Sequence, residues 1–329
     1  MYMFLSLFGA FEEGLIYAII AIGVYLSFRI LDFPDLTVDG SFVTGAAVAS
    51  IAIISGVPPV VASLLALIAG FSAGVITGLL HTKGKINPLL AGILMMTALY
   101  SINLRVMGKP SLALLNESTL FKQINTIWEK LPFDAWLNNF LELFGVSRFP
   151  RTWAIIFIML LIVLMIKVMI DYFLKTEVGL ALRATGDNQR MIRSFSANTD
   201  TLIIIGIGLS NGLVGLAGGL FAQYSGNANV GMGVGLIITG LASVIIGEAL
   251  FGTKTIFRTT LAVIFGAIIY RMVITLALRT KFLEAGDMKL ITATLVIIAL
   301  VTPNIIENLR DKKRREKRNE EMLNKVGDK

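Results

Sequence analysis

The sequence predicts an all-α polytopic membrane protein with about nine transmembrane segments, within a range of about eight to ten. Apolar residues make up 55% of the 329 positions and charged residues 16%, and the mean hydropathy is +0.78. These values lie well on the apolar side of an ordinary globular domain. The apolar residues gather in runs that approach the roughly 20 residues needed for one helical span. The charges gather in the polar segments between those runs.

Nine apolar segments are the candidate spans: residues 8–28, 42–54, 59–80, 86–107, 152–174, 201–221, 232–250, 256–278 and 288–301. No basic leader precedes the first segment, so we expect it to be retained as a span. Residues 42–54 are too few to cross a bilayer unaided, and residues 232–250 could be re-entrant. Together the segments define a transmembrane domain over residues 1–309, followed by a basic tail over residues 310–329.

Cations in the connecting segments predict the orientation of the spans. Lys and Arg occur in residues 81–85, in a polar insert at 175–200, at Lys254 and Arg258, and in the tail. Because such residues mark the cytoplasmic side, an N-terminus outside and a C-terminus in the cytoplasm satisfy all of them. The tail would lie against anionic lipid, which accounts for much of the net charge of +7 without a nucleic-acid partner.

Residues 106–151 form a long polar excursion that this orientation places outside. Trp128 and Trp136 suit interfacial helices anchored at the membrane surface. Two interpretations remain open: a docking surface for an external solute-binding protein, or a simple surface hairpin.

The inventory of reactive side chains excludes most catalytic chemistry. There is no cysteine, and His81 is the one histidine, so disulfides, cysteine nucleophiles and histidine metal clusters are excluded. Residues 247–255 nearly imitate a phosphate loop, but Gly252 is followed by Thr253 rather than by lysine. We therefore expect no catalytic residue, no metal site and no cofactor in this chain, which cannot hydrolyse ATP by itself.

The polar insert at 175–200 is longer than a turn between two spans requires. Asp187 is a candidate N-cap for a short helix over residues 188–195. That helix would present apolar side chains beside basic ones: Met191, Ile192, Phe195, Arg190 and Arg193. It would be either a docking element for a soluble cytoplasmic partner or an ordinary solvated loop.

A break in the helical pattern at residues 32–40 is the first candidate for the translocation path. Asp32, Asp35 and Asp39 bracket Pro34, and ionisable groups at membrane depth need a partner or a cavity. Asp35 and Asp39 would line the path, or the segment is a turn that caps the next helix. Residues 225–235 form a second break, so two inverted halves with interrupted helices are a further possibility.

Five side chains within the spans are additional path candidates. The neutral ones are suited either to a zwitterionic solute or to bonds between helices: Tyr100, Asn103, Asn211 and Gln223. Arg271 would meet a substrate carboxylate, pair with an acid such as Glu248, or extend to the outer surface.

Glycines recur at helical spacing in two spans: Gly70, Gly74 and Gly78 in one, and Gly208, Gly212, Gly215 and Gly219 in the other. Such faces allow two helices to approach closely in lipid. We expect them to be packing surfaces, within one chain or between two copies.

Two stretches resemble one family. Gly179, Arg183, Ala184, Asp187 and Met191, followed by NTD at 198–200, resemble the cytoplasmic coupling loop of ABC-importer permeases in the branched-chain amino acid permease superfamily. Residues 14–49 resemble the first span of that family and the motif after it. The motif LDFPDLTVDGSF departs from the branched-chain version and is closer to the subgroup associated with tryptophan or tyrosine uptake.

This resemblance implies an importer of amino acids, aromatic ones first, that works by alternating access in the bacterial inner (cytoplasmic) membrane. It implies a cytoplasmic ABC ATPase dimer that uses ATP and Mg, an extracytoplasmic solute-binding protein and a second permease copy, with a homodimer favoured. The implied ATPase-coupling residues are Arg183, Asp187, Asn188, Arg190, Met191, Ile192, Arg193 and Phe195. The alternative is a stand-alone, ion-coupled secondary transporter of small polar solutes.

Overall fold

The computed structural model describes residues 2–142, 149–150, 152–195 and 197–278, together with positions 290, 293, 294 and 297. The described elements are α1 (Tyr2–Val24), the π-helical turn η1 (Tyr25–Ile30), α2 (Thr37–Ile54), α3 (Pro59–Thr82), α4 (Pro88–Met107), β1 (Ser111–Ala113), α5 (Leu120–Trp128), α6 (Phe133–Glu142), α7 (Ala154–Phe173), α8 (Glu177–Asp187), α9 (Gln189–Ser194), α10 (Thr199–Ser225), β2 (Asn227–Asn229), α11 (Leu236–Phe251) and α12 (Ile256–Ala277). Strands β1 and β2 pair antiparallel, with Leu112 opposite Ala228.

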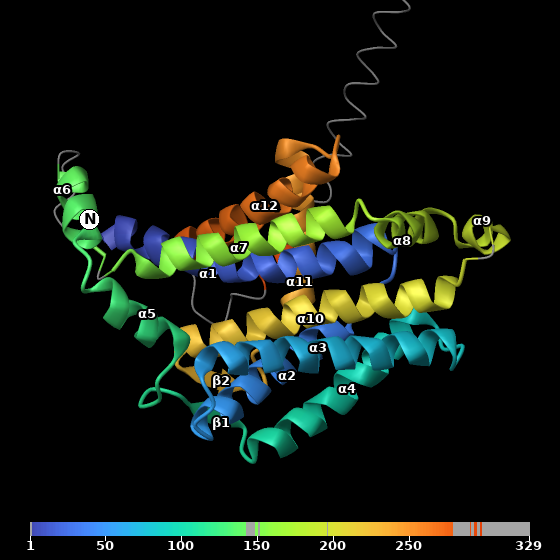
Figure 1. Ribbon diagram of the computed structural model, residues 1–329, viewed down its shortest axis with the longest axis horizontal. Helices are drawn as coiled ribbons and strands as arrows, with labels where there is room; N and C mark the ends of the chain where they lie inside the picture. Colours follow the sequence, from blue (N-terminus) through green and yellow to red (C-terminus); the bar gives the residue numbers. More distant parts are fainter. Residues whose placement is uncertain are drawn as a thin grey trace, which may run out of the picture.

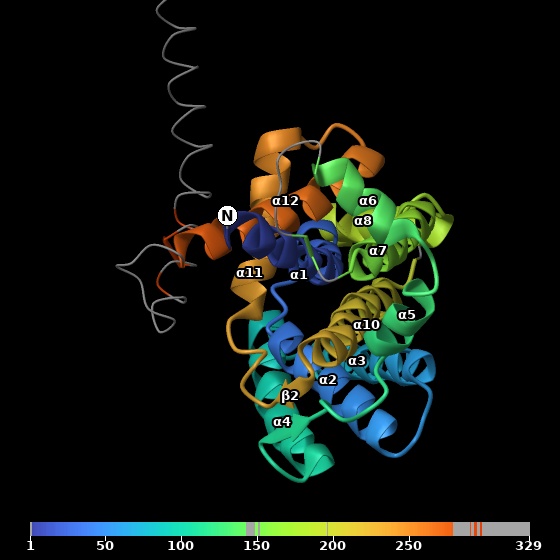
Figure 2. The ribbon, with the colours of Figure 1, turned by 90° about the vertical axis from the view of Figure 1, so that its left-hand side faces the viewer.

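The long helices form two groups that lie side by side (Figure 1). We call α2, α3, α4 and α10 the α10 bundle, and α1, α7, α11 and α12 the α12 bundle. Helix α1 packs against α10 and so joins the two groups, and α11 packs on α12 and contacts α2 (Figure 2). Helices α8 and α9 extend from one end of the molecule, and α5 and α6 lie at the other (Figure 1).

The helix ends follow local sequence signals. Pro88 stands in the first turn of α4, after Asn87, whose side chain accepts the amide of Leu89 at 3.0 Å. Helix α10 begins after Asn198, which accepts the amide of Thr201 at 3.2 Å, and ends at Gly226 with φ of 69°. Capping at both ends holds these spans to a defined length.

Seven helices in the described part of the chain are long and apolar enough to cross a membrane. Helix α2 qualifies because it begins at Thr37, five positions before the expected segment, and reaches 18 residues. Helix α11 has 16 residues and is shorter than a span. The expected span at 288–301 and the tail at 310–329 lie almost wholly outside the described residues, so the number nine and the inverted repeat stay predictions.

The glycine stripes predicted to be packing surfaces lie between helices of the α10 bundle. An added Cβ at Gly70 would lie 2.3 Å from the carbonyl oxygen of Asn211, and one at Gly45 would lie 1.9 Å from that of Gly215. Helices α2, α3 and α10 therefore touch backbone to backbone, which no larger residue at these positions allows. The contact is within one chain.

The excursion at 106–151 contains two amphipathic helices, α5 and α6. Trp128 of α5 donates its indole N–H to Asp134 at 2.8 Å and stacks on Phe157 of α7, with ring centroids 5.6 Å apart. These contacts attach the excursion to the α12 bundle. Its position at the membrane surface stays a prediction.

Candidate functional site

Two interrupted helices meet near the middle of the molecule. The chain leaves η1 at Ile30, passes through an irregular segment, and starts α2 at Thr37. Within that segment, Asp35 bonds to Asn211, which lies near the centre of the 27-residue α10. Helix α2 therefore begins at about half the height of the bundle, as the half-helices of transporters do.

Asp39, in the first turn of α2, connects this start to the start of α11. Its two carboxylate oxygens accept the amides of Gly235 and Ile237, both at 2.8 Å. Asp39 thus caps the N-terminus of a helix almost two hundred positions away, where a negative charge is stabilised by the helix dipole. Gly233 completes the contact, because an added Cβ there would lie 2.1 Å from the carbonyl oxygen of Asp39.

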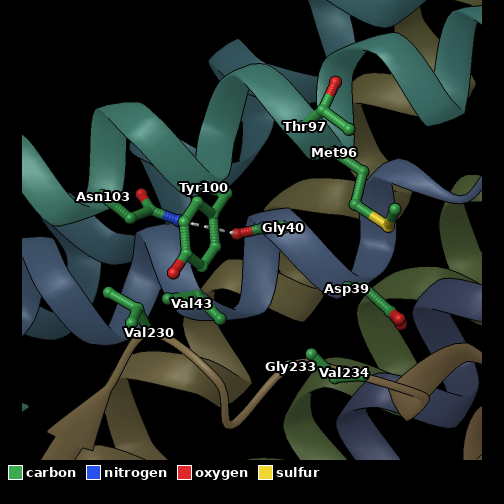
Figure 3. A pocket seen from close by; sticks show the side chains of 10 residues that line it. All are labelled: Asp39, Gly40, Val43, Met96, Thr97, Tyr100, Asn103, Val230, Gly233 and Val234. Atoms are coloured by element: carbon green, nitrogen blue, oxygen red, sulfur yellow. Dashed lines mark hydrogen bonds between the residues drawn. The ribbon is translucent and has the colours of Figure 1, made fainter. Parts of the chain in front are cut away.

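A cavity of about 300 Å³ opens between α2, α4 and the loop before α11. It is lined by Asp39, Gly40, Val43, Met96, Thr97, Tyr100, Asn103, Val230, Gly233 and Val234 (Figure 3). The walls are apolar apart from a carboxylate, a hydroxyl, a phenol and an amide. A few polar groups in an apolar hollow are typical of small-molecule sites.

Asn103 and Tyr100 come from the same face of α4. The Asn103 side chain is 1% exposed and donates its Nδ2 to the carbonyl of Gly40 at 3.2 Å, as Figure 3 shows. Its Oδ1 is buried with no hydrogen-bond partner among the described residues. Such a group is costly when unpaired and available to a solute donor. Tyr100 is 54% exposed and places its ring beside Asn103.

Asp35 and Asn211 do not line this cavity. Asp35 is fully buried and accepts the amide of Thr37 at 2.8 Å and the Asn211 amide at 2.5 Å. Asn211 in turn accepts the Ser41 hydroxyl at 2.7 Å, and Thr37 bonds to Thr77 of α3 at 2.8 Å. This network fastens the irregular segment to α10 and α3 and orients the helix that carries Asp39.

Gln223 also lies away from the cavity. Its amide accepts the N–H of Leu120 at 3.0 Å and donates to the Ser63 hydroxyl at 2.8 Å, so it ties α10 to α5 and α3.

Arg271 pairs with Glu13 of α1 and lies over the ring of Tyr17, 4.9 Å from its centroid. Glu248, which the sequence offered as one possible partner of Arg271, instead pairs with Arg29 at 3.0 Å. That pairing suggestion was wrong because residues so distant in sequence cannot be matched by spacing.

The insert at 175–200 folds into two helices rather than one. Helix α8 begins after Thr176, whose hydroxyl accepts the Gly179 amide at 3.3 Å. Threonine is a good N-cap residue, but the sequence analysis did not predict a helix here. The expected cap Asp187 is the last residue of α8. Asn188 caps α9, accepting the amide of Met191 at 3.1 Å.

The predicted coupling side chains differ in exposure. Phe195 is 73% exposed, and Met191 and Arg190 are exposed as well, whereas Ile192 is buried. Arg193 bonds to Thr199 at 2.9 Å and to Asp200 at 3.2 Å, which holds α9 on the start of α10. The partly buried Arg183 lines a separate polar pocket.

Sequence reasoning missed part of the cavity. Met96 lies four positions before Tyr100 and seven before Asn103, so helical periodicity places the three on one face. The loop residues Val230, Gly233 and Val234 carried no such signal, because their position depends on the long-range bond to Asp39.

The architecture defines a class of protein: a polytopic membrane protein with interrupted helices around a solute-sized cavity. The family model described as "Branched-chain amino acid transport system / permease component" matches residues 6–301. The chain belongs to this family and is a multi-pass membrane permease.

Individual relatives agree with that assignment. A tyrosine transport system permease protein of Clostridioides difficile (strain R20291) is 40% identical over 298 residues, 91% of each chain. Uncharacterized protein RP368 of Rickettsia prowazekii (strain Madrid E) is 34% identical over 242 residues, 74% of this chain and 76% of the relative. The autoinducer 2 import system permease protein LsrC of Photorhabdus luminescens is 28% identical over 207 residues, 62% of this chain and 55% of the relative. No solved structure matches the chain significantly. The predicted superfamily and its tyrosine-associated subgroup are confirmed.

Proposed function

We propose that this permease carries aromatic amino acids, tyrosine or tryptophan, through the cavity beside Asp39, as part of an ATP-driven importer. The supporting observation is the cavity itself, which lies where two half-helices begin, in a chain 40% identical to a protein named for tyrosine transport. A zwitterion with an aromatic side chain suits this lining.

The ammonium group and the aromatic side chain of such a solute have matching groups in the lining. The Asp39 carboxylate has lone pairs beyond the two used by Gly235 and Ile237, and these accept a substrate ammonium. The ring of Tyr100 and the sulfur of Met96 offer favourable contacts to an aromatic side chain. The buried Oδ1 of Asn103 accepts one further donor.

The test is uptake of labelled tyrosine by the complete transport system in membrane vesicles. Tyr100→Ala removes the aromatic wall, and uptake should fall roughly tenfold while competition by leucine changes little. Ser101→Ala is the matched control, because it alters the next residue of α4, which does not line the cavity. Wild-type tyrosine uptake in Tyr100→Ala would exclude this cavity as the aromatic site.

Energy for transport comes, in this proposal, from a separate cytoplasmic ATPase dimer that binds ATP and Mg. The chain would lie in the bacterial cytoplasmic membrane with its N-terminus outside and its C-terminus inside, pair with a second copy as a homodimer, and receive solute from an extracytoplasmic binding protein. The coupling surface would be the exposed part of α9, Arg190, Met191 and Phe195, together with the ends formed by Asp187 and Asn188.

Arg190→Glu tests the coupling surface more cleanly than a change at Arg193, which is bonded to Asp200. We expect the variant to insert normally and to lose substrate stimulation of ATP turnover. The reversed charge would repel an acidic contact on the ATPase. Full stimulation in Arg190→Glu would contradict the docking assignment. Tyrosine uptake into liposomes that lack the ATPase would favour an ion-coupled carrier.

A further inference from the structure

A second pocket, of about 200 Å³, lies where α8 meets η1 and the ends of α11 and α12. Its lining is largely polar and charged, unlike that of the cavity beside Asp39. The lining residues are Tyr25, Arg29, Ile30, Arg183, Asp187, Glu248, Thr253, Lys254, Thr255, Ile256 and Thr259. Three of these side chains are cations and two are acids, so the pocket carries an excess of positive charge.

Two of the cations have no partner among the residues that the structure describes. Arg29 pairs with Glu248 at 3.0 Å, which neutralises both. Arg183 and Lys254 form no ion pair and no hydrogen bond with the part of the chain that the structure describes. Arg183 is also partly buried, and a cation withdrawn from water is stabilised by a nearby anion. Asp187, exposed at the rim, is the remaining acid in the lining.

Neutral donors face the same pocket. Tyr25 is 5% exposed, lies among the charges of Glu248, Arg183 and Arg29, and its hydroxyl has no hydrogen-bond partner among the described residues. Tyr25 lines the pocket, so its hydroxyl can donate a hydrogen bond to a ligand bound there.

The N-terminus of the 22-residue α12 adds one further donor, the backbone amide of Ile256, which lines the pocket. Thr255 accepts the amide of Arg258 at 3.3 Å, but the amides of Ile256 and Phe257 have no partner in the described ranges. Free amides at the start of a long helix, where the dipole is positive, bind anions.

We propose that this pocket binds a phosphate-type oxyanion. Arg183 and Lys254 supply the charge, and the Tyr25 hydroxyl and the Ile256 amide supply hydrogen bonds. A free phosphate ion and the phosphate of an anionic lipid share this chemistry. The pocket lies at the ends of membrane-crossing helices, beside a basic insert, where anionic headgroups gather. The bound anion would connect η1 and α12 to α8.

An experiment with two arms distinguishes a free phosphate ion from the phosphate of an anionic lipid. Both arms use the purified full chain without any ATPase. In the first arm, thermal unfolding in a neutral detergent is followed with inorganic phosphate or with sodium chloride of equal ionic strength. In the second arm, the chain is placed in phosphatidylcholine nanodiscs with or without phosphatidylglycerol, and co-purifying phosphatidylglycerol is quantified by mass spectrometry. Binding should raise the unfolding midpoint by about 5 °C at saturation.

The variant Arg183→Gln/Lys254→Gln should lose this shift and retain roughly tenfold less phosphatidylglycerol, as expected when charge-assisted hydrogen bonds are lost. Lys83→Gln is the matched control, since it removes an exposed cation at the end of α3, outside the pocket. If the double variant fails to fold, Tyr25→Phe, which removes only the hydroxyl, replaces it and should show a smaller loss of the same kind.

A shift with phosphate identifies a free ion, and a shift or retention with phosphatidylglycerol alone identifies a lipid; either supports the proposal. Equal behaviour of wild type and pocket variants in both arms overturns it. Because the ATPase and the amino acid are absent, a negative result here leaves the proposed transport function standing.

Discussion

The α10 bundle and the α12 bundle are held together in different ways. In the α10 bundle, backbones touch at glycines such as Gly45 and Gly70, and the buried polar groups form a network around Asp35. In the α12 bundle, backbone contact joins α11 and α12, where an added Cβ at Gly266 would lie 2.0 Å from the carbonyl oxygen of Ser243, and polar side chains connect α12 to α1 and α7, as between Arg271 and Glu13. Backbone contacts fix two helices at one distance, whereas long side chains keep contact over a range of distances.

The kind of contact indicates which helices are held at a fixed distance. Lys167 of α7 illustrates the second kind of contact: its Nζ lies 2.5 Å from Asp171 Oδ2, outside hydrogen-bonding geometry, and 3.1 Å from the centroid of the Phe257 ring. Asp171 also accepts the Thr260 hydroxyl of α12 at 2.7 Å. We infer that α2, which glycine contacts hold against α10, is the fixed wall of the cavity.

The largest effect should come from a glycine of the fixed wall. An added Cβ at Gly218 would lie 1.9 Å from the carbonyl oxygen of Phe42, so Gly218→Val forces α2 and α10 apart and should destabilise the fold by about 3 kcal/mol. Gly9→Val is the matched control, because nothing lies within 4 Å of a Cβ there. Both are compared by thermal unfolding in detergent. Equal midpoints would mean that the α10 bundle is not rigid.

An intermediate effect should follow from the polar network. Asp35→Asn places an amide beside the Asn211 amide and loses a charge-assisted hydrogen bond, which costs about 2 kcal/mol. Asp32→Asn, in the same segment, changes an exposed side chain at φ of 51°, a conformation that asparagine tolerates. We therefore expect Asp35→Asn to lower the unfolding midpoint and Asp32→Asn to leave it unchanged. A larger drop in the unfolding midpoint for Asp32→Asn than for Asp35→Asn would contradict the stabilising role of the Asp35 network.

The smallest effect should come from a charged tether of the α12 bundle. Arg271→Gln leaves Glu13 without its partner in a partly exposed setting and should cost about 1 kcal/mol. Adding Glu13→Gln removes the orphaned charge and should restore much of the loss, which a double-mutant cycle measures. Additive losses would show that the two side chains do not interact in the folded protein.

The sequence predicted the features that depend on local periodicity. The glycine stripes, the two helix breaks and the polar insert all follow from repeats or composition within about 20 residues. The partners of Asp39, Arg271 and Glu248 could not be predicted, because each bond joins helices that only the tertiary fold brings together. The cap of α9 was missed by one residue, since Asp187 and Asn188 are both good caps and the backbone geometry decides between them.

The carboxylate that anchors α11 has a mechanical consequence. One side chain both faces the solute cavity and holds the first turn of a 16-residue helix whose far end borders α8 and the pocket there. If the proposed substrate ammonium binds this carboxylate, it would compete with the amides of Gly235 and Ile237 and loosen the start of α11. Occupancy of the cavity would then be coupled to the orientation of α11. The cytoplasmic end of that helix would move when solute binds.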